Sequence, residues 1–183
     1  LKVEKDPEFG GDFHSDEGSV PVRRWPKSEM LPDQIAFYEA CKAYGFGESP
    51  DQNHPDSTGI GPIPLNNAGG IRWSTALTYL GPARRRLNLT IRAETYVRSV
   101  VFDSGRATGV VAQSGGELFE LTAGEVILAG GAYASPQLLM LSGVGPANEL
   151  EQHGISILSD LQGVGKNLRD HPQVQLTFST KPD

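Results

Sequence analysis

The first half of the chain contains one clear amphipathic pattern, over residues 32–44. Phe37, Cys41 and Tyr44 recur at helical spacing, a proline stands in the first turn, and Gly45 follows the last turn. Apolar residues three and four positions apart lie on one face of a helix, and an initial proline and a final glycine mark helix boundaries. The pattern therefore predicts a helix over residues 32–44.

The sequence around this helix is mostly typical of loops. Val20–Arg24 predicts a short strand, and Ser74 is placed to cap a short helix that runs to Leu80 and ends at Gly81-Pro82. Residues 46–70 contain too much glycine, proline, asparagine and aspartate for regular structure, which predicts a long loop. Long loops inside compact domains are often functional.

The pattern changes after residue 86, where short runs of apolar and β-branched residues are separated by glycine-containing turns. This spacing is typical of a β-meander, in which neighbouring strands are joined by tight turns. The predicted strands are Leu87–Arg92, Tyr96–Asp103, Gly109–Gln113, Glu117–Thr122 and Glu125–Ala129.

The last part of the chain mixes helix and strand signals. Pro136–Leu141 predicts a helix with proline at its first position and Ser135 as its N-cap. Pro146–His153 predicts a second helix, because a glycine follows it at the C-terminal cap position. Ile155–Leu158 and Gln173–Phe178 predict the final strands.

The transition from Val126–Ala129 through Gly130-Gly131 to a helix raises the question of a nucleotide-binding turn. A dinucleotide site needs G-x-G-x-x-G directly between a strand and a helix. The chain contains four G-x-G triplets, and none has glycine or alanine at the sixth position. The pyrophosphate fingerprint is therefore absent. The two glycines either bring backbone near a bound cofactor or form a plain strand–helix corner, and the residues alone leave both open.

Composition excludes several classes of partner. The formal net charge of −6 argues against nucleic acid or an anionic membrane. No apolar run approaches the roughly 18 residues of a membrane span. Cys41 is the only cysteine, which indicates a reducing, cytoplasmic location. His14, His54 and His153 are interpreted as solvated, and no spacing of ligand residues indicates a metal site.

The two ends of the chain suggest a piece of a longer protein. The sequence begins at Leu1 without an initiator methionine, and it ends at Asp183 just beyond a strand-like run. An incomplete sheet would leave strand edges and an apolar face uncovered, so we expect the isolated chain to self-associate.

The stretch GAYASPQLLMLSGVG, residues Gly131–Gly145, resembles a signature of the glucose–methanol–choline (GMC) flavin oxidoreductases. Other landmarks of that family follow in the expected order, so that the resemblance covers residues 18–178. They are GIRWSTALTYLGPARRRLNLTI (Gly70–Ile91), TYVRSVVFDSGRATGVV (Thr95–Val111) and LQGVGKNLRDHP (Leu161–Pro172). The choline-dehydrogenase-like branch is the most similar.

The resemblance implies an FAD enzyme that oxidises a small alcohol by hydride transfer to the flavin, with the electron acceptor left open. It implies an α+β fold, in which part of the antiparallel sheet of a substrate domain joins β-meander strands and a helix of an incomplete FAD-binding domain. In the family, the pyrophosphate loop lies near the N-terminus and the catalytic histidine near the C-terminus. No catalytic residue is therefore expected in this chain, which we predict to be inactive by itself and not to retain FAD.

The resemblance also suggests how the chain is divided. Residues 1–19 would form a loop or poorly ordered lead, and residues 20–86 a substrate-domain segment with the long loop. Residues 87–154 would belong to the FAD-binding domain, and residues 155–183 would return to the substrate domain.

Five residues match functional positions of the family. Val97 matches the position whose backbone contacts the adenine, and Ala129 and Gly130 match the turn near the ADP portion of FAD. His171 matches a histidine on the substrate side of the flavin, where it could bind the alcohol oxygen. Gln173 stands where choline-oxidising members have a carboxylate, which puts choline as the substrate in doubt.

Two other functions stay open on the sequence. A hydroxynitrile lyase shares the fold and FAD without net redox chemistry, and only residues absent from this chain would separate it from an oxidoreductase. A binding or assembly module without catalysis is the alternative from a different class.

Overall fold

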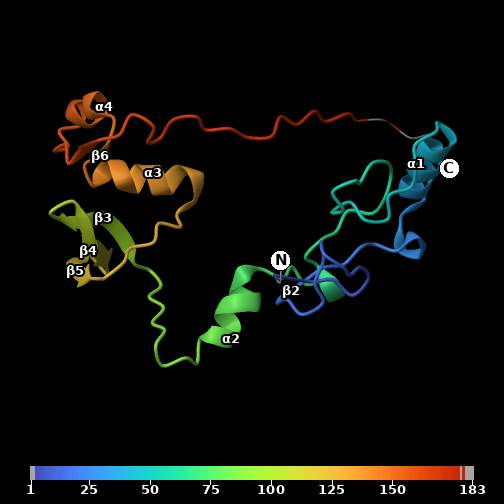
Figure 1. Cartoon of the computed structure of the whole chain (residues 1–183), viewed down its shortest axis with the longest axis horizontal. Helices are drawn as coiled ribbons and strands as arrows, with labels where there is room; N and C mark the ends of the chain where they lie inside the picture. The colour runs from blue at the N-terminus through green and yellow to red at the C-terminus, as the bar shows by residue number, and fades with distance from the viewer. Residues whose placement is uncertain (1–2, 178, 180–183) are drawn as a thin grey trace. The chain divides into compact units, whose positions relative to one another are not determined.

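The computed structural model describes residues 3–177 and 179, which form two compact units, Leu1–Ile91 and Arg92–Asp183 (Figure 1). Both helices and small sheets are present, which confirms the α+β fold class. The finer assignment of four segments to two domains stays a prediction.

The first unit contains little regular structure. Its elements are β1 (Glu4–Lys5), β2 (Val20–Pro21), η1 (Lys27–Glu29), α1 (Pro32–Ala43), η2 (Ala68–Gly70), η3 (Ala76–Leu80) and α2 (Gly81–Ala83). β1 pairs with β2 in parallel. The strand predicted over Val20–Arg24 is thus shorter than expected, although Arg23 adds an isolated antiparallel bridge to Leu65.

Helix α1 confirms the predicted helix almost to the residue. Pro32 occupies its first position, and Gly45, just beyond its end, has a φ of 106°, a conformation that glycine adopts without strain. The predicted apolar face is not buried, because Phe37 is 65% exposed and Tyr44 is 86% exposed. The spacing of the apolar residues therefore predicted the helix correctly, but it did not show whether another part of the chain buries its apolar face.

The predicted end at Gly81-Pro82 is wrong. The turn of π-helix η3 continues into α2 through these two residues. Pro82 lacks an N–H for the helical hydrogen bonds, but its fixed φ is compatible with helical backbone, so the helical turn passes through it. Ser74 makes no side-chain cap; its backbone carbonyl instead accepts hydrogen bonds from the N–H groups of Leu77 and Thr78.

The second unit contains the predicted β-meander. Strands β3 (Tyr96–Asp103), β4 (Arg106–Ser114) and β5 (Glu117–Thr122) form one antiparallel sheet in the order β3-β4-β5. Ser104-Gly105 and Gly115-Gly116 link the strands, and all four residues have positive φ. Two-residue turns with positive φ match the twist of antiparallel strands, which is why these sequences predict the hairpins correctly.

Two of the five strands predicted for the meander do not form. Leu87–Arg92 is irregular, and Glu125–Ala129 has no ladder partner among the described residues. Apolar alternation favours extended backbone, but a strand also needs a neighbour to accept its N–H groups. Ile127 is 79% exposed in this unpaired segment, and self-association through it stays a prediction.

Helix α3 (Gly131–Leu141) begins five residues earlier than predicted. Ser135 is therefore inside the helix and not its cap, and Pro136 lies one turn from the start. At that position proline lacks the N–H that would bond the carbonyl of Ala132, a loss that weakens the helix locally, and α3 nevertheless continues to Leu141. The proline rule placed the boundary too late because the two glycines before it already allow the chain to turn.

The remaining elements position α3. Helix α4 (Ala147–Gln152) confirms the second predicted helix, and β6 (Val144–Gly145) pairs in parallel with β7 (Ser159–Asp160). The strand expected at Ile155–Leu158 thus lies slightly later. Residues 173–177 of the last predicted strand are irregular, and Phe178 lies outside the described residues. α3 packs against β3 and β6 (Figure 1).

Candidate functional site

A cavity of about 300 Å³ lies between β3, the segment 126–130 and α3. It brings together all three residues predicted to contact the cofactor, Val97, Ala129 and Gly130. They come from sequence positions about thirty residues apart, and the packing of α3 on β3 joins them. Their role in binding stays a prediction, but their common location is a structural fact.

Gly130 is closely confined at the corner of this cavity. A Cβ atom on Gly130 would lie 3.0 Å from the Cβ of Ala134 and 3.2 Å from the backbone nitrogen of Ser135. Gly131 has a φ of 77°, which also favours glycine. Glycine is therefore favoured at Gly131 by its backbone conformation and at Gly130 by the crowding, and Gly130 lines the cavity without a side chain.

The chemistry of this cavity suits binding rather than catalysis. Among the described residues, its lining is mainly aliphatic, with Tyr96, Ser135 and Gln137 as the polar side chains. No carboxylate, imidazole, amine or thiol of the described residues lines it. Apolar walls with a few polar groups hold a planar ring by packing and orient it through hydrogen bonds.

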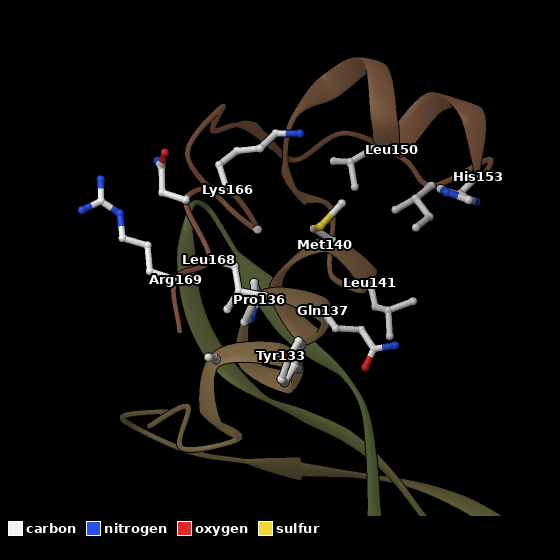
Figure 2. A pocket seen from close by; sticks show the side chains of 14 residues that line it. Tyr133, Pro136, Gln137, Met140, Leu141, Leu150, His153, Lys166, Leu168 and Arg169 are labelled. Atoms are coloured by element: carbon white, nitrogen blue, oxygen red, sulfur yellow. The ribbon is translucent and has the colours of Figure 1, made fainter. Parts of the chain in front are cut away.

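A larger cavity, of about 1030 Å³, opens along another side of α3 (Figure 2). Met140 of α3, Leu150 of α4 and Leu168 of the irregular segment after β7 contribute apolar side chains. Figure 2 shows Lys166 and Arg169 on one side of the hollow and His153 on the opposite side. Lys166 forms an ion pair with Glu149. The three residues predicted to contact the cofactor do not line this cavity.

His171 and Gln173 line neither cavity. Both are exposed in the irregular segment that follows Arg169. Asp170 accepts a hydrogen bond at 2.8 Å from the backbone N–H of His171, so it does not occupy the imidazole ring. The structure therefore places these two residues apart from Val97, Ala129 and Gly130.

The first unit contains a buried ionic network that the sequence did not reveal. His14, interpreted as solvated, is only 9% exposed, and this interpretation is wrong. Its Nε2 lies 2.7 Å from Asp51 Oδ2, and its Nδ1 lies 2.9 Å from Glu4 Oε1. Arg24 donates to Asp6 Oδ2 at 2.7 Å and to Asp51 Oδ1 at 2.9 Å.

Hydrogen bonding controls the charges in this network. Burial lowers the pKa of His14, but hydrogen bonds to Asp51 and Glu4 outweigh it and raise the pKa above its ordinary value. Burial raises the pKa of Asp6, yet the N–H of Glu8 and the guanidinium of Arg24 lower it overall. The pKa of Asp51 is likewise lowered against burial, by the N–H of Asn53 and by His14 and Arg24.

Three members of the network have the geometry to hold a metal ion. One ligand atom each from Glu4, Asp6 and His14 lies within 4.8 Å of the others. No motif in the sequence indicates this group. However, Arg24 already donates to Asp6 Oδ2, and His14 already pairs with the carboxylates of Glu4 and Asp51. Arg24 and His14 thus already pair with the carboxylates that a metal ion would need, and we assign the network a structural role.

Within the part of the chain that the structure describes, no helix combines the length and the apolar character needed to cross a membrane.

Comparison with known proteins identifies the class to which this fold belongs. The family model described as GMC oxidoreductase matches residues 3–173. The chain therefore belongs to the GMC oxidoreductase family, and the resemblance of its motifs is confirmed. FAD is the cofactor of this family.

Individual relatives agree with this assignment. A GMC-type oxidoreductase of Rhodococcus erythropolis is 41% identical over 177 residues, covering 97% of this chain and 36% of the relative. The oxygen-dependent choline dehydrogenase of Staphylococcus haemolyticus is 37% identical over 169 residues, covering 92% of this chain and 29% of that protein. The chain thus spans about a third of the length of these relatives.

Solved structures show the same arrangement of elements. Pyridoxine 4-oxidase from Mesorbium loti matches with a TM-score of 0.80 and 30% identity, covering 88% of this chain and 32% of that one. An FAD-dependent oxidoreductase from Chaetomium thermophilum matches with a TM-score of 0.79 over 88% of this chain and 30% of its own. At 24% identity the latter likeness concerns the fold alone.

Proposed function

We propose that this chain provides part of the FAD site, and part of the wall facing the substrate, in an oxidoreductase that acts on the CH–OH group of small alcohols. Bound FAD would accept a hydride from the alcohol. Val97, Ala129 and Gly130 hold the adenosine end of the cofactor through backbone contacts. His171 hydrogen-bonds the alcohol oxygen, and Gln173 lies beside it.

The observation that carries the proposal is the first cavity. Three residues chosen as cofactor contacts from the family resemblance line one small space, and a Cβ on Gly130 would crowd Ala134 and Ser135. Such close backbone approach is what a site for a planar ring and its sugar requires. Family membership supplies the identity of the ring.

The matching experiment replaces Gly130 in the FAD-loaded enzyme that contains this chain. A methyl group at this corner must displace Ala134 or the wall of the cavity. Overpacking costs about 1–3 kcal/mol, and FAD binding should weaken by about 5- to 150-fold if the bound state bears that cost. Gly124→Ala is the matched control, because a Cβ on Gly124 has no atom within 4 Å. Equal FAD dissociation constants for the two variants, measured by flavin fluorescence, would contradict the proposed site.

We propose that the substrate is a neutral primary alcohol rather than choline. A cation and a carboxylate about 4 Å apart attract by about 4 kcal/mol at an effective dielectric constant of 20, before desolvation is subtracted. Gln173 provides no such charge. Named relatives include both a choline dehydrogenase and a pyridoxine oxidase, so either kind of substrate is known among the family members compared.

Substitution of Gln173 tests the substrate proposal. We expect the wild-type enzyme to have a higher kcat/KM for a neutral primary alcohol than for choline. Gln173→Glu should narrow or reverse that preference. His171→Ala should lower kcat/KM for both substrates. An unchanged ratio in Gln173→Glu would mean that Gln173 is wrongly placed beside the substrate. The inactivity of the isolated chain and its failure to retain FAD stay predictions.

A further inference from the structure

Ser142 follows the last residue of α3 and connects two walls of the first cavity without lining it. Its hydroxyl donates to the carbonyl oxygen of Leu138 at 2.6 Å and accepts the backbone N–H of Val100 at 2.8 Å. Leu138 lines the cavity from α3. Val100 is on β3, three residues after Val97. One side chain therefore joins the helix wall to the strand wall.

The position of this hydroxyl is itself fixed. The backbone N–H of Ser142 also donates to the carbonyls of Leu138 and Leu139. The next residue, Gly143, has a φ of 83°, and a Cβ there would lie 2.5 Å from the carbonyl oxygen of Ser156. The carbonyl of Gly143 accepts the N–H of Leu158 at 2.8 Å. The turn is thus held on both sides and aims the hydroxyl at β3.

Among the described residues, no other hydrogen bond joins β3 to α3. β3 is the outer strand of its sheet, so the N–H of Val100 has no strand partner on that side. Val100 is only 7% exposed. Removing the hydroxyl would leave a buried donor without an acceptor, and β3 would have to shift to satisfy it.

We propose that Ser142 is a positioning residue for the FAD site, which sets the separation between Val97 on β3 and the Ala129–Gly130 corner before α3. This inference rests on the proposed function. It assigns to Ser142 an effect on cofactor affinity rather than on the hydride transfer step, because the residue acts only through the walls of the cavity that binds the adenosine end.

The test uses the FAD-loaded enzyme that contains this chain, with Ser142→Ala as the main variant. In the apoenzyme of this variant β3 can shift to satisfy the N–H of Val100, and FAD binding must reverse that shift and leave the donor unpaired. FAD binding should therefore weaken by up to about tenfold. The kcat per bound flavin at saturating FAD should stay within about twofold. Ser142→Thr keeps the hydroxyl and should restore affinity, and Ser142→Cys, with its weak donor and acceptor, should be intermediate.

Ser156→Ala is the control, because it removes an exposed serine hydroxyl from the same unit. Amide hydrogen exchange at Val100 gives a readout independent of the cofactor, and Ser142→Ala should accelerate it. Faster exchange with unchanged FAD affinity would overturn the inference and leave the proposed function standing. A lower kcat per flavin with unchanged affinity would also overturn it. A wild-type enzyme that does not bind FAD would contradict the proposed function itself.

Discussion

Each of the two units of this chain is stabilised internally by a different kind of interaction. The buried polar residues among those described, which include Asp6, His14, Arg24 and Asp51, all lie in the first unit. Four of the five buried apolar residues, Val100, Ala112, Val144 and Leu150, lie in the second. A segment with little regular structure uses charged hydrogen bonds to fix its loops, whereas a sheet and its helices use apolar packing.

This difference determines which substitutions should destabilise each unit. Paired buried charges are costly to break because the partner left behind is uncompensated. Apolar packing is sensitive to lost volume but not to protonation. Tryptophan fluorescence separates the two, because both tryptophans, Trp25 and Trp73, belong to the first unit.

The largest expected effect comes from Arg24→Ala. It leaves Asp6 and Asp51 without their guanidinium, and we expect the free energy of unfolding of the first unit to fall by about 3–5 kcal/mol. Urea unfolding followed by tryptophan fluorescence measures it. Arg23→Ala is the control, because Arg23 pairs with Glu29 at the surface, where such a pair contributes about 0–1 kcal/mol. Similar losses for both arginines would contradict a special role of the network.

The next effect concerns the second unit. Leu150 is completely buried, so Leu150→Ala should destabilise this unit by about 2–5 kcal/mol through lost burial and a residual cavity. Amide hydrogen exchange in α3 and α4 should accelerate, while the tryptophan transition should not move. Leu158→Ala, at a half-exposed position, should change the exchange little. A shift of the tryptophan transition in Leu150→Ala would show that the units do not unfold separately.

The smallest of the three effects is pH dependence of the first unit. Because the folded pKa of His14 is raised, its contribution is fully present below the unfolded value near 6.5 and is lost as pH rises through the folded pKa. Hydrogen bonds to charged groups contribute about 1.5–3 kcal/mol. Because the pKa values of Asp6 and Asp51 are lowered, their contributions are present above about 3.9 and are lost as pH falls.

His14→Gln should remove the alkaline part of this profile and leave the acidic part. Urea midpoints by tryptophan fluorescence from about pH 3 to about pH 9 would be compared with those of His153→Gln, which alters an exposed histidine of the other unit. If wild type and His14→Gln lost stability equally above neutral pH, the protonated His14 would not be a source of stability.

Local patterns in the sequence predicted the elements that local chemistry determines. Glycine-containing turns with positive φ, Ser104-Gly105 and Gly115-Gly116, specified the hairpins of the meander, and spacing specified α1. The segment Glu125–Ala129 could not be predicted in this way, since its strand character depends on a partner rather than on its own residues. The start of α3 was placed late because proline was taken as a boundary that the preceding glycines already provide.

The two candidate sites also differ in how far the sequence could predict them. Val97, Ala129 and Gly130 could be chosen from family motifs, and the packing of α3 on β3 brought them together. The ionic network could not be found, because its five members, Glu4, Asp6, His14, Arg24 and Asp51, are spread over almost fifty positions with no motif. Only the fold of the loops shows that His14 is enclosed by carboxylates.

The hydroxyl of Ser142 also affects how easily another chain can pair with the outer strand of the sheet. An outer strand with free N–H groups is a template on which another chain can add a strand. At the centre of β3 that template is interrupted, because the N–H of Val100 is already bound to a side chain of its own chain. A strand approaching this edge would have to displace a hydrogen-bonded serine on a fixed turn. Edge-to-edge aggregation at β3 is thereby opposed by a single side chain.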